Sequence, residues 1–175
     1  MLGVLLFVTL LVGMGIGGSD KKGSGAPGST SGEKKTETKN NPRSDNVEVA
    51  VGETAELRDR TLIVNEVERD YFPDSRSARN PQSGNEFIRV YITLTNTGNV
   101  DFPYNVGKFE IQDSNGVQHR GESLSELPYR IGSGDLASGG TLEGNIVFQI
   151  PQGDSGIGMV YEPFEQNAGT ITVGL

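Results

Sequence analysis

The chain has no cysteine, no tryptophan and a single histidine, His119, among its 175 residues. Without cysteine it has no disulfides and no thiolate ligands, which excludes both a disulfide-stabilised fold and a cysteine-ligated zinc site. Any Ser-His-Asp catalytic triad would have to use His119 as its base. We therefore predict no metal ligands and no cofactor.

Basic side chains are scarce in the part of the chain that carries strand patterns. Residues 46–175 contain 9 Lys and Arg against 19 Asp and Glu, a net charge of −10, while the whole chain carries −8. Nucleic-acid phosphates and anionic lipid headgroups bind clustered Lys and Arg, so such a domain repels them. We predict no nucleic-acid partner, and contact with a membrane through the N-terminal segment only.

One short motif resembles a catalytic signature. Gly-Asp-Ser-Gly at 153–156 is the sequence that surrounds the nucleophilic serine of chymotrypsin-type proteases. That protease fold builds its site between two β-barrels, for which residues 46–175 are too few, and the one available base is His119. We interpret 153–156 as a turn and predict no catalytic residue.

The first eighteen residues form an uncharged apolar run, MLGVLLFVTLLVGMGIGG. About 20 such residues cross a bilayer as a helix, so residues 1–18 are either a signal peptide or an N-terminal membrane anchor. No Lys or Arg precedes the run, and we hypothesise that the true start lies upstream. Residues 19–45 have the Gly, Ser, Lys and Glu composition of a disordered linker.

From residue 46 onward the pattern is that of β-strands. Residues 86–96 alternate apolar and polar side chains, with Ile88, Val90, Ile92 and Leu94 on the apolar face, and 142–150 repeat the alternation. A period of two indicates a half-buried strand, which must lay its apolar face on a second layer. The extended stretches, separated by turn residues, are 47–57, 61–70, 86–97, 108–113, 117–120, 141–150, 157–162 and 169–175. Residues 46–175 are therefore predicted to be an all-β, antiparallel sandwich of seven to nine strands.

Several of these segments carry a resemblance in their order along the chain: VGET at 51–54, LIVNEVE at 62–68, FIRVYITLTNTG at 87–98, FEIQDSNG at 109–116 and GNIVFQIP at 144–151. Together they resemble the immunoprotective extracellular, immunoglobulin-like domain of a large family of bacterial and archaeal surface lipoproteins, a domain of unknown function. The resemblance implies an immunoglobulin-like sandwich that is exported and usually membrane-tethered, with no assigned activity or ligand. This chain departs from the pattern at Met14, where a lipobox would have its lipidated cysteine.

Two connections, 71–85 and 121–140, exceed the usual loop length, and binding residues concentrate on such loops. If successive strands alternate in direction, 121–140 shares one end of the sandwich with 98–107 and 163–168. The linker, 71–85 and 152–156 would then lie at the other end.

Aromatic side chains and an arginine gather at the first of these ends, and such residues dominate interface energetics. We hypothesise a binding surface there that points away from the linker, formed by Phe102, Tyr104, Tyr129, Arg130 and Phe164. Alternatively, Phe102 and Tyr104 pack under their own loops. A second candidate surface lies on 71–85, with Tyr71, Phe72, Arg76 and Arg79.

The sequence thus favours a non-enzymatic, lipoprotein-like module that is exported to the cell surface, either membrane-tethered or secreted. Its expected partner is an unknown protein or cell-envelope component. A structural or stress-related envelope protein without a discrete ligand is the alternative, and a hydrolase is a further one.

Overall fold

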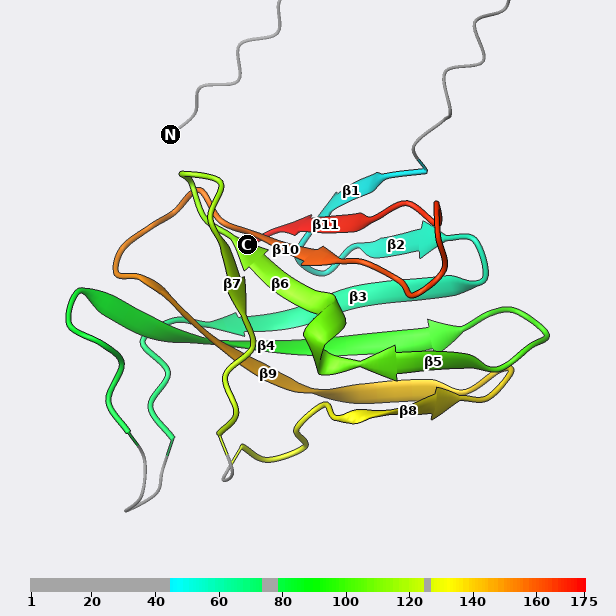
Figure 1. The fold of residues 1–175 in the computed structure, drawn as a ribbon, viewed down its shortest axis with the longest axis horizontal. Helices are drawn as coiled ribbons and strands as arrows, with labels where there is room; N and C mark the ends of the chain where they lie inside the picture. Colours follow the sequence, from blue (N-terminus) through cyan, green and yellow to red (C-terminus); the bar gives the residue numbers. More distant parts are fainter. Residues whose placement is uncertain (1–44, 74–78, 125–126) are drawn as a thin grey trace, which may run out of the picture. The chain divides into compact units, whose positions relative to one another are not determined.

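The computed structural model describes residues 45–73, 79–124 and 127–175, so the predicted signal peptide or anchor and nearly all of the linker lie outside the described residues. Within these ranges the chain forms eleven strands and one 3-10 helix, with no α-helix (Figure 1). We find there no helical segment with the length and apolarity that a membrane crossing requires. The elements are β1 (Val47–Ala50), β2 (Thr54–Leu57), β3 (Arg60–Glu68), β4 (Asn85–Asn96), β5 (Phe102–Asn105), η1 (Val106–Lys108), β6 (Phe109–Gln112), β7 (Gln118–Arg120), β8 (Ser133–Leu136), β9 (Thr141–Pro151), β10 (Gly158–Tyr161) and β11 (Ile171–Gly174).

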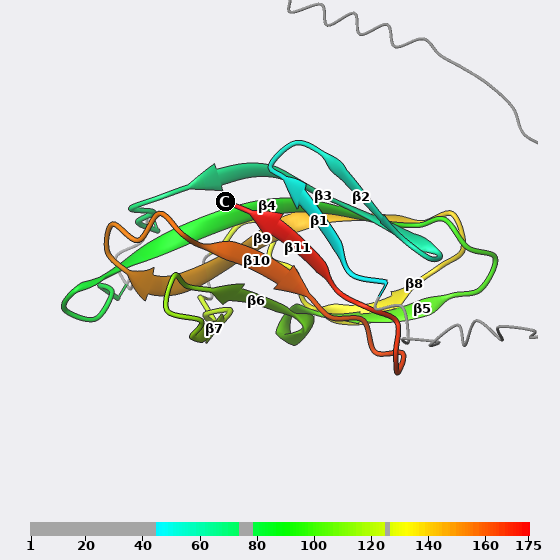
Figure 2. The same ribbon diagram turned by 90° about the horizontal axis from the view of Figure 1, so that it is seen from above.

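Two sheets make up most of the domain. One has the strand order β1-β11-β10-β6-β7 and the other β2-β3-β4-β9, while β5 and β8 form a separate short ladder. Neighbouring strands are antiparallel except β1 and β11, which pair in parallel with Val47 opposite Ile171. Figure 2 shows β1, β11, β10 and β6 running obliquely over β3, β4 and β9. The predicted all-β, immunoglobulin-like antiparallel sandwich is therefore confirmed.

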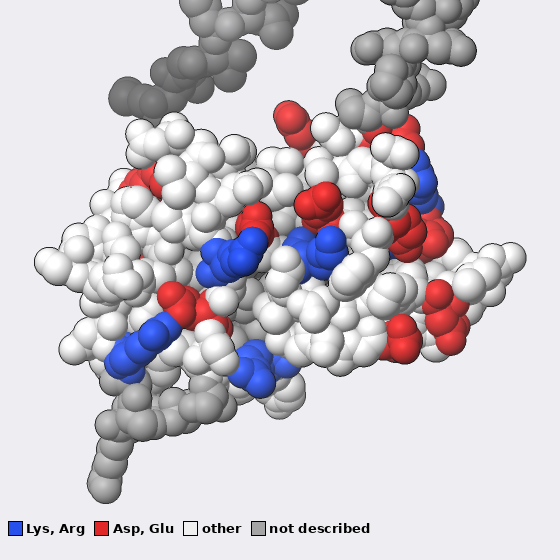
Figure 3. Space-filling view, in the orientation of Figure 1, with Lys and Arg blue, Asp and Glu red and all other residues white. Residues whose placement is uncertain are grey.

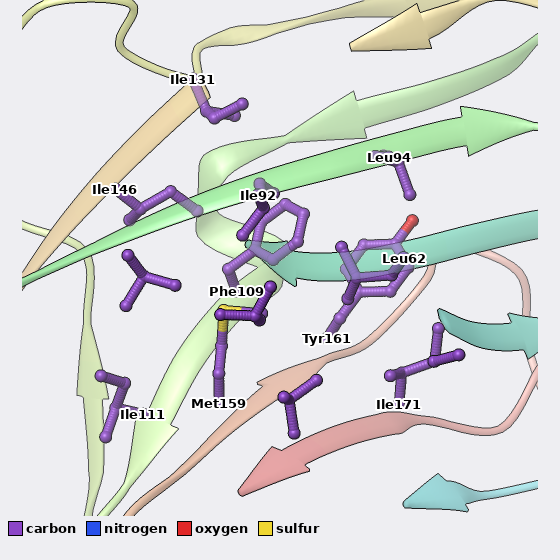
Figure 4. Close-up of a cluster of buried hydrophobic side chains, with 14 of the residues drawn as sticks. Leu62, Ile92, Leu94, Phe109, Ile111, Ile131, Ile146, Met159, Tyr161 and Ile171 are labelled. Atoms are coloured by element: carbon purple, nitrogen blue, oxygen red, sulfur yellow. The ribbon is translucent and has the colours of Figure 1, made fainter. Parts of the chain in front are cut away.

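The core lies between the sheets, on the face that the alternation predicts. Figure 4 shows side chains of the two sheets meeting there, and the rings of Phe109 and Tyr161 stack with centroids 4.7 Å apart. Removing these apolar surfaces from water is the main stabilising contribution to such a fold. The residues that β4 and β9 contribute to this core are all buried, namely Ile88, Val90, Ile92, Leu94, Ile146, Phe148 and Ile150.

The first predicted strand, 47–57, is two strands with a reversal between them. At the turn, the N–H of Glu53 donates to the carbonyl of Ala50 at 3.1 Å. The Glu53 carboxylate in turn accepts from the N–H of Ala50 at 2.9 Å. Gly52 takes the position with φ of 84°, a conformation that glycine adopts without steric penalty. β1 therefore belongs to the five-stranded sheet and β2 to the four-stranded sheet. This split, together with the short strands β5 and β8, raises the number of strands above the predicted seven to nine.

The same reversal decides at which end of the sandwich β1 begins. Arg58 donates to the Asp45 carboxylate at 3.2 Å and also bonds the carbonyl of Asn167. The N–H of Thr170 donates to Asn46 Oδ1 at 3.1 Å. Residues 45–46 thus lie beside the β10–β11 loop. The prediction that the linker joins at the end opposite 163–168 is wrong, because one unrecognised turn inverts the direction of β1.

We call this end of the sandwich the proximal end and the opposite one the distal end. The proximal end consists of 45–46, 58–59, 97–101, 137–140 and 162–170. At the distal end the described parts of 71–85 meet 152–156, as predicted, because the N–H of Gln152 donates to the carbonyl of Gly84 at 3.0 Å.

The segment 121–140 does not form a single loop at one end, as the sequence led us to expect. Its first part follows the edge of β9 that β4 leaves free, with the N–H of Glu122 donating to the carbonyl of Val147 at 2.7 Å. Its later part contains β8, which pairs with β5. Leu124 and Leu127 cover Phe87 and Val147 on the outer side of the four-stranded sheet, which forms a second, smaller apolar cluster.

A buried cation ties the proximal end together. The Arg60 side chain is 3% exposed, and its guanidinium donates to Glu165 at 2.7 Å, to Asp59 at 2.9 Å and to the Tyr161 hydroxyl at 3.2 Å. The guanidinium also lies over the ring of Phe102, 4.1 Å from its centroid. Burial opposes the charged form, but these bonds outweigh it and keep the pKa of Arg60 above its ordinary value.

A buried carboxylate has the same role at the distal end. Glu86 pairs with Arg69 and accepts from the N–H groups of Gly153 at 2.9 Å and Asp70 at 3.2 Å. Arg69 also donates to the carbonyl of Asp154 at 2.6 Å, so the pair joins β3 and β4 to the β9–β10 loop. Burial alone would raise the pKa of Glu86, but the bonds from Arg69 and the two N–H groups together lower it below its ordinary value.

Glu86 should make the stability of the domain depend on pH. A carboxylate whose pKa falls on folding stabilises the native state above its unfolded pKa, about 4.3, and this contribution is lost as the pH falls through the folded pKa. We predict that Glu86→Gln lowers the free energy of unfolding by roughly 1–3 kcal/mol at pH 7 and that the deficit shrinks at pH 3. Urea unfolding at the two pH values measures both quantities.

The matched control is Glu66→Gln, which changes an exposed partner of Arg89. It should alter the free energy of unfolding by less than about 0.5 kcal/mol at either pH. A Glu86→Gln deficit of the same size at pH 7 and pH 3 would contradict the role given to the ionised Glu86.

Candidate functional site

Residues 127–133, which we call the strap, lie along the free edge of β9 (Figure 1). The N–H of Asn145 donates to the carbonyl of Tyr129 at 2.8 Å, and the N–H of Ile131 donates to the carbonyl of Asn145 at 3.1 Å. Leu127 and Ile131 anchor the strap because both side chains are buried. The strap therefore covers a strand edge whose unpaired N–H and C=O groups would otherwise be open to another chain.

Asn145 holds the strap with its side chain as well as its backbone. Its Nδ2 donates to the carbonyl of Pro128 at 2.9 Å, and its Oδ1 accepts from Arg89 at 3.2 Å. Asn145 is only 3% exposed, and its side-chain Nδ2 and Oδ1 and its backbone N–H and carbonyl all have hydrogen-bond partners. A buried polar group that is satisfied in this way rigidifies its surroundings.

Gly144 allows the strap to lie this close to β9. A Cβ atom at this position would stand 2.5 Å from the carbonyl oxygen of Tyr129 and 2.7 Å from Cδ1 of Ile131. No side chain fits at such distances. Glycine inside a strand pattern is a known sign of close backbone approach, and this was the signal in the sequence that could have identified the site.

The strap displays Tyr129 and Arg130 to solvent. Tyr129 is 83% exposed and has a φ of 50°, in the left-handed region that non-glycine residues rarely adopt. Such a conformation costs on the order of 1 kcal/mol and persists only where the surroundings enforce it. Here the bonds from Asn145 on both sides of Tyr129 enforce it.

A small cavity opens beside the strap, between η1, β9 and residues 121–123 and 127–133, with a volume of about 200 Å³. Apolar side chains of four residues line it, namely Val106, Leu127, Ile131 and Ile146. Arg130 and Ser123 also line it, and Arg130 Nη1 lies 3.4 Å from the Ser123 hydroxyl. The cavity is therefore apolar in part, with polar groups that include a cation.

The other three predicted binding residues lie elsewhere. Phe102 is 2% exposed beneath the Arg60 guanidinium, so its ring is part of the core. Tyr104 is half-buried in β5, next to Gly134 of β8. Phe164 is exposed in the β10–β11 loop, with the Lys108 ammonium 4.6 Å from its ring centroid.

The structure thus brings together Tyr129 and Arg130 of the five residues that the sequence singled out. Of the second candidate surface, Phe72 is exposed at the distal end, Tyr71 packs against the Phe87 cluster and Arg79 pairs with Glu122. Arg76 lies outside the described residues.

The Gly-Asp-Ser-Gly sequence forms a turn in which Asp154 binds neighbouring donors. Its carboxylate accepts from the N–H and the hydroxyl of Ser114 at 3.0 and 2.9 Å, and from the N–H of Gly156 at 3.0 Å. The two N–H groups hold the pKa of Asp154 below its ordinary value. The motif therefore connects the β9–β10 loop to the β6–β7 turn.

His119 is part of the β6–β7 hairpin. Its Nε2 lies 2.9 Å from Oδ2 of Asp113, whose other oxygen accepts from the N–H of Val117 at 2.9 Å. These contacts, the one to His119 first, lower the pKa of Asp113. Within the described ranges, no three His, Asp or Glu side chains gather as a metal site would require.

These features define a two-sheet β-sandwich module that displays an aromatic side chain and an arginine beside a small cavity. The chain belongs to the family described as Domain of unknown function (DUF4352), which matches residues 49–170. Membership of a family of unknown function is therefore confirmed, while the immunoprotective and archaeal associations of the resemblance stay predictions. No curated protein matches this chain.

Solved structures share the fold at low sequence identity. The yjhA protein from Bacillus subtilis is 22% identical, with 74% of this chain and 98% of that protein covered and a TM-score of 0.56. The ycdA protein from Bacillus subtilis, called a candidate lipoprotein, is 13% identical, with 70% and 38% covered and a TM-score of 0.60. The secreted protein MPT63 from Mycobacterium tuberculosis is 12% identical, with 74% and 97% covered and a TM-score of 0.50. At these identities the likeness concerns the fold.

Gly144→Ala tests the close approach of the strap to β9. The added methyl group would force the Tyr129 carbonyl and the Ile131 side chain away from the strand, and overpacking of this kind costs roughly 1–3 kcal/mol. We predict a loss of that size in the free energy of unfolding, measured in urea.

Gly132→Ala is the matched control on the same strap, because a Cβ at that position meets no atom within 4 Å. It should change the free energy of unfolding by less than about 0.5 kcal/mol. Equal effects of the two substitutions would show that the strap does not pack on Gly144 as described.

Proposed function

We propose that this chain is an exported, membrane-tethered, non-enzymatic module that binds a protein or cell-envelope component through Tyr129 and Arg130. The observation that carries the proposal is the display of Tyr129, which is 83% exposed at a φ of 50°. Tyrosine and arginine are enriched among the residues that dominate binding energies. Both side chains are exposed on a strap whose Leu127 and Ile131 side chains are buried.

The energetics of the strap support a binding role. A tyrosine at positive φ is less stable than a glycine there, and an exposed ring gains little from burial in the free protein. Strained residues held by an over-determined framework are common at functional sites. A contact made by the Tyr129 ring in a complex would offset the cost of its backbone conformation.

The ionisable groups support a non-enzymatic role. In the described part of the chain, three carboxyl groups have lowered pKa values, and each is bonded to turns or strand ends of the sandwich: Glu86, Asp113 and Asp154. The single histidine bonds one of them, Asp113. The bonds of the three carboxylates and of the histidine therefore serve to connect loops and strands of the sandwich.

Export and tethering rest on the sequence of residues 1–45, an apolar run followed by a polar linker. Two solved structures with the same fold are called a secreted protein and a candidate lipoprotein, which is in keeping with such a location. Because residue 45 lies at the proximal end, a tether would join the domain there.

The first test is the stability of Tyr129→Gly. Glycine relieves the strain at positive φ, so we predict that this substitution raises the free energy of unfolding by about 1 kcal/mol. Val100→Gly removes a side chain that is 67% exposed at a position without a positive φ, so it should be neutral or destabilising. A loss of stability in Tyr129→Gly would contradict the strain assigned to this position.

The second test is capture of partners from a cell-envelope fraction by the immobilised full chain. We expect Tyr129→Gly and Arg130→Ser to lose a captured component that the wild type and Val100→Gly retain. Capture by Tyr129→Gly that equals the wild type would overturn the binding role of the strap. It would favour the alternative of an envelope protein without a discrete ligand.

A further inference from the structure

The cavity beside the strap has the size of a small chemical group. Its volume of about 200 Å³ compares with about 30 Å³ for one water molecule in the liquid, so it holds roughly six or seven non-hydrogen atoms. Sites for whole drug-sized ligands start at about 300 Å³. The occupant that fits is therefore a branched aliphatic group or a single ring.

The side chains of the cavity divide into an apolar part and a polar part. Val106 and Ile146 approach from η1 and β9, while Leu127 and Ile131 come from the strap. An aliphatic group that packs against these side chains loses part of its contact with water, which is favourable by about 0.8 kcal/mol for each CH₂ buried. A polar group in contact with these four side chains alone would lose hydrogen bonds to water.

The polar part favours an anion. Arg130 lines the cavity with Ser123, and in the described part of the chain it forms no ion pair. Glu122 also lines the cavity, but its carboxylate is paired with Arg79. Among the described residues that line the cavity, the charge that is left is thus the Arg130 guanidinium, whose planar fork matches a carboxylate.

This local charge contrasts with the acidic character of the domain as a whole. Figure 3 shows Lys and Arg side chains spread over the middle of one face, with many of the Asp and Glu side chains gathered toward one end. An anion that approaches the strap therefore meets a basic side chain on a domain whose net charge is −10.

We infer that the cavity binds an apolar carboxylate, that is, a branched aliphatic group of about five carbon atoms that ends in COO⁻, with the carboxylate on Arg130 and Ser123. The inference rests on the proposed function, because it names the chemistry that the strap would recognise. Such a group occurs both in a free short-chain acid and at the C-terminus of a peptide that ends in leucine. The two sources share one ligand chemistry.

The test is a titration of the ¹⁵N-labelled full chain with 4-methylpentanoate, followed by the shifts of its backbone amide signals in NMR spectra. So few atoms bind with a dissociation constant of about 1 mM. We expect shifts at Val106, Arg130, Ile131 and Ile146, and at least a fivefold weaker affinity for the neutral 4-methylpentanamide. No saturable shift at these four residues would overturn the inference, as would equal affinities for acid and amide.

Arg130→Gln should weaken binding of 4-methylpentanoate about tenfold, because it removes a charge-assisted hydrogen bond. Arg120→Gln is the matched control, since Arg120 is 85% exposed outside this cavity and pairs with Glu110. It should bind as the wild type does. An Arg130→Gln variant that retains wild-type affinity would also overturn the inference.

A second titration separates the two sources. A pentapeptide with a free C-terminal leucine that binds more than tenfold tighter than 4-methylpentanoate identifies a protein C-terminus. Tighter or equal binding of the free acid identifies a small molecule. If the peptide binds more tightly, amidation of its C-terminal carboxylate should remove the gain in affinity over 4-methylpentanoate. Binding of the acid without capture of any envelope component would leave this inference standing while the proposed partner protein fails.

Discussion

The long antiparallel ladder between β4 and β9 is the constraint on which the rest of the structure depends. It pairs the two strands from Asn85 opposite Pro151 to Thr95 opposite Thr141. Because side chains alternate along a strand, this register fixes an inner face for the core and an outer face with Phe87 and Val147. It also leaves one edge of β9 to be covered. Asn145 and Gly144 lie along that edge, and they hold the strap that displays Tyr129.

The parts of the fold that follow from the alternation of apolar and polar side chains could be predicted from the sequence. The alternation in 86–96 and 142–150 gave the two central strands and their buried faces, since a period of two has one structural meaning over so many residues. The short strands β5 and β8 were not predicted because they lack an alternation of apolar and polar side chains. β5 contains Pro103, and β8 contains Gly134. The reversal at Ala50–Glu53 was missed as well, since it occupies few residues inside an extended stretch. Because of that turn, β1 begins at the proximal end of the sandwich, whereas the predicted alternation of strands places its start at the distal end.

The candidate site was predictable by residue type and not by position. Exposed Tyr129 and Arg130 are the kind of side chains that the composition of 121–140 suggested. Their separation from Phe102 and Phe164 follows from the pairing of the strap with β9, a contact between segments distant in sequence. The same is true of Asn145, whose amide bonds Pro128 and Arg89. Hydrogen bonds between segments that are distant in sequence cannot be predicted from a local pattern. Gly144, in contrast, is a glycine inside a strand pattern, which by itself indicates a close approach of another backbone.

Native-state hydrogen exchange of the amides of Asn145 and Ile131 tests the central claim that the strap is fixed to β9. Both N–H groups donate across the edge between strap and strand. If the strap is part of the sandwich, both amides should open with free energies within about 1 kcal/mol of those in the β4–β9 ladder. Exchange of either amide as fast as that of an exposed loop would contradict the claim, because the display of Tyr129 and Arg130 depends on these bonds.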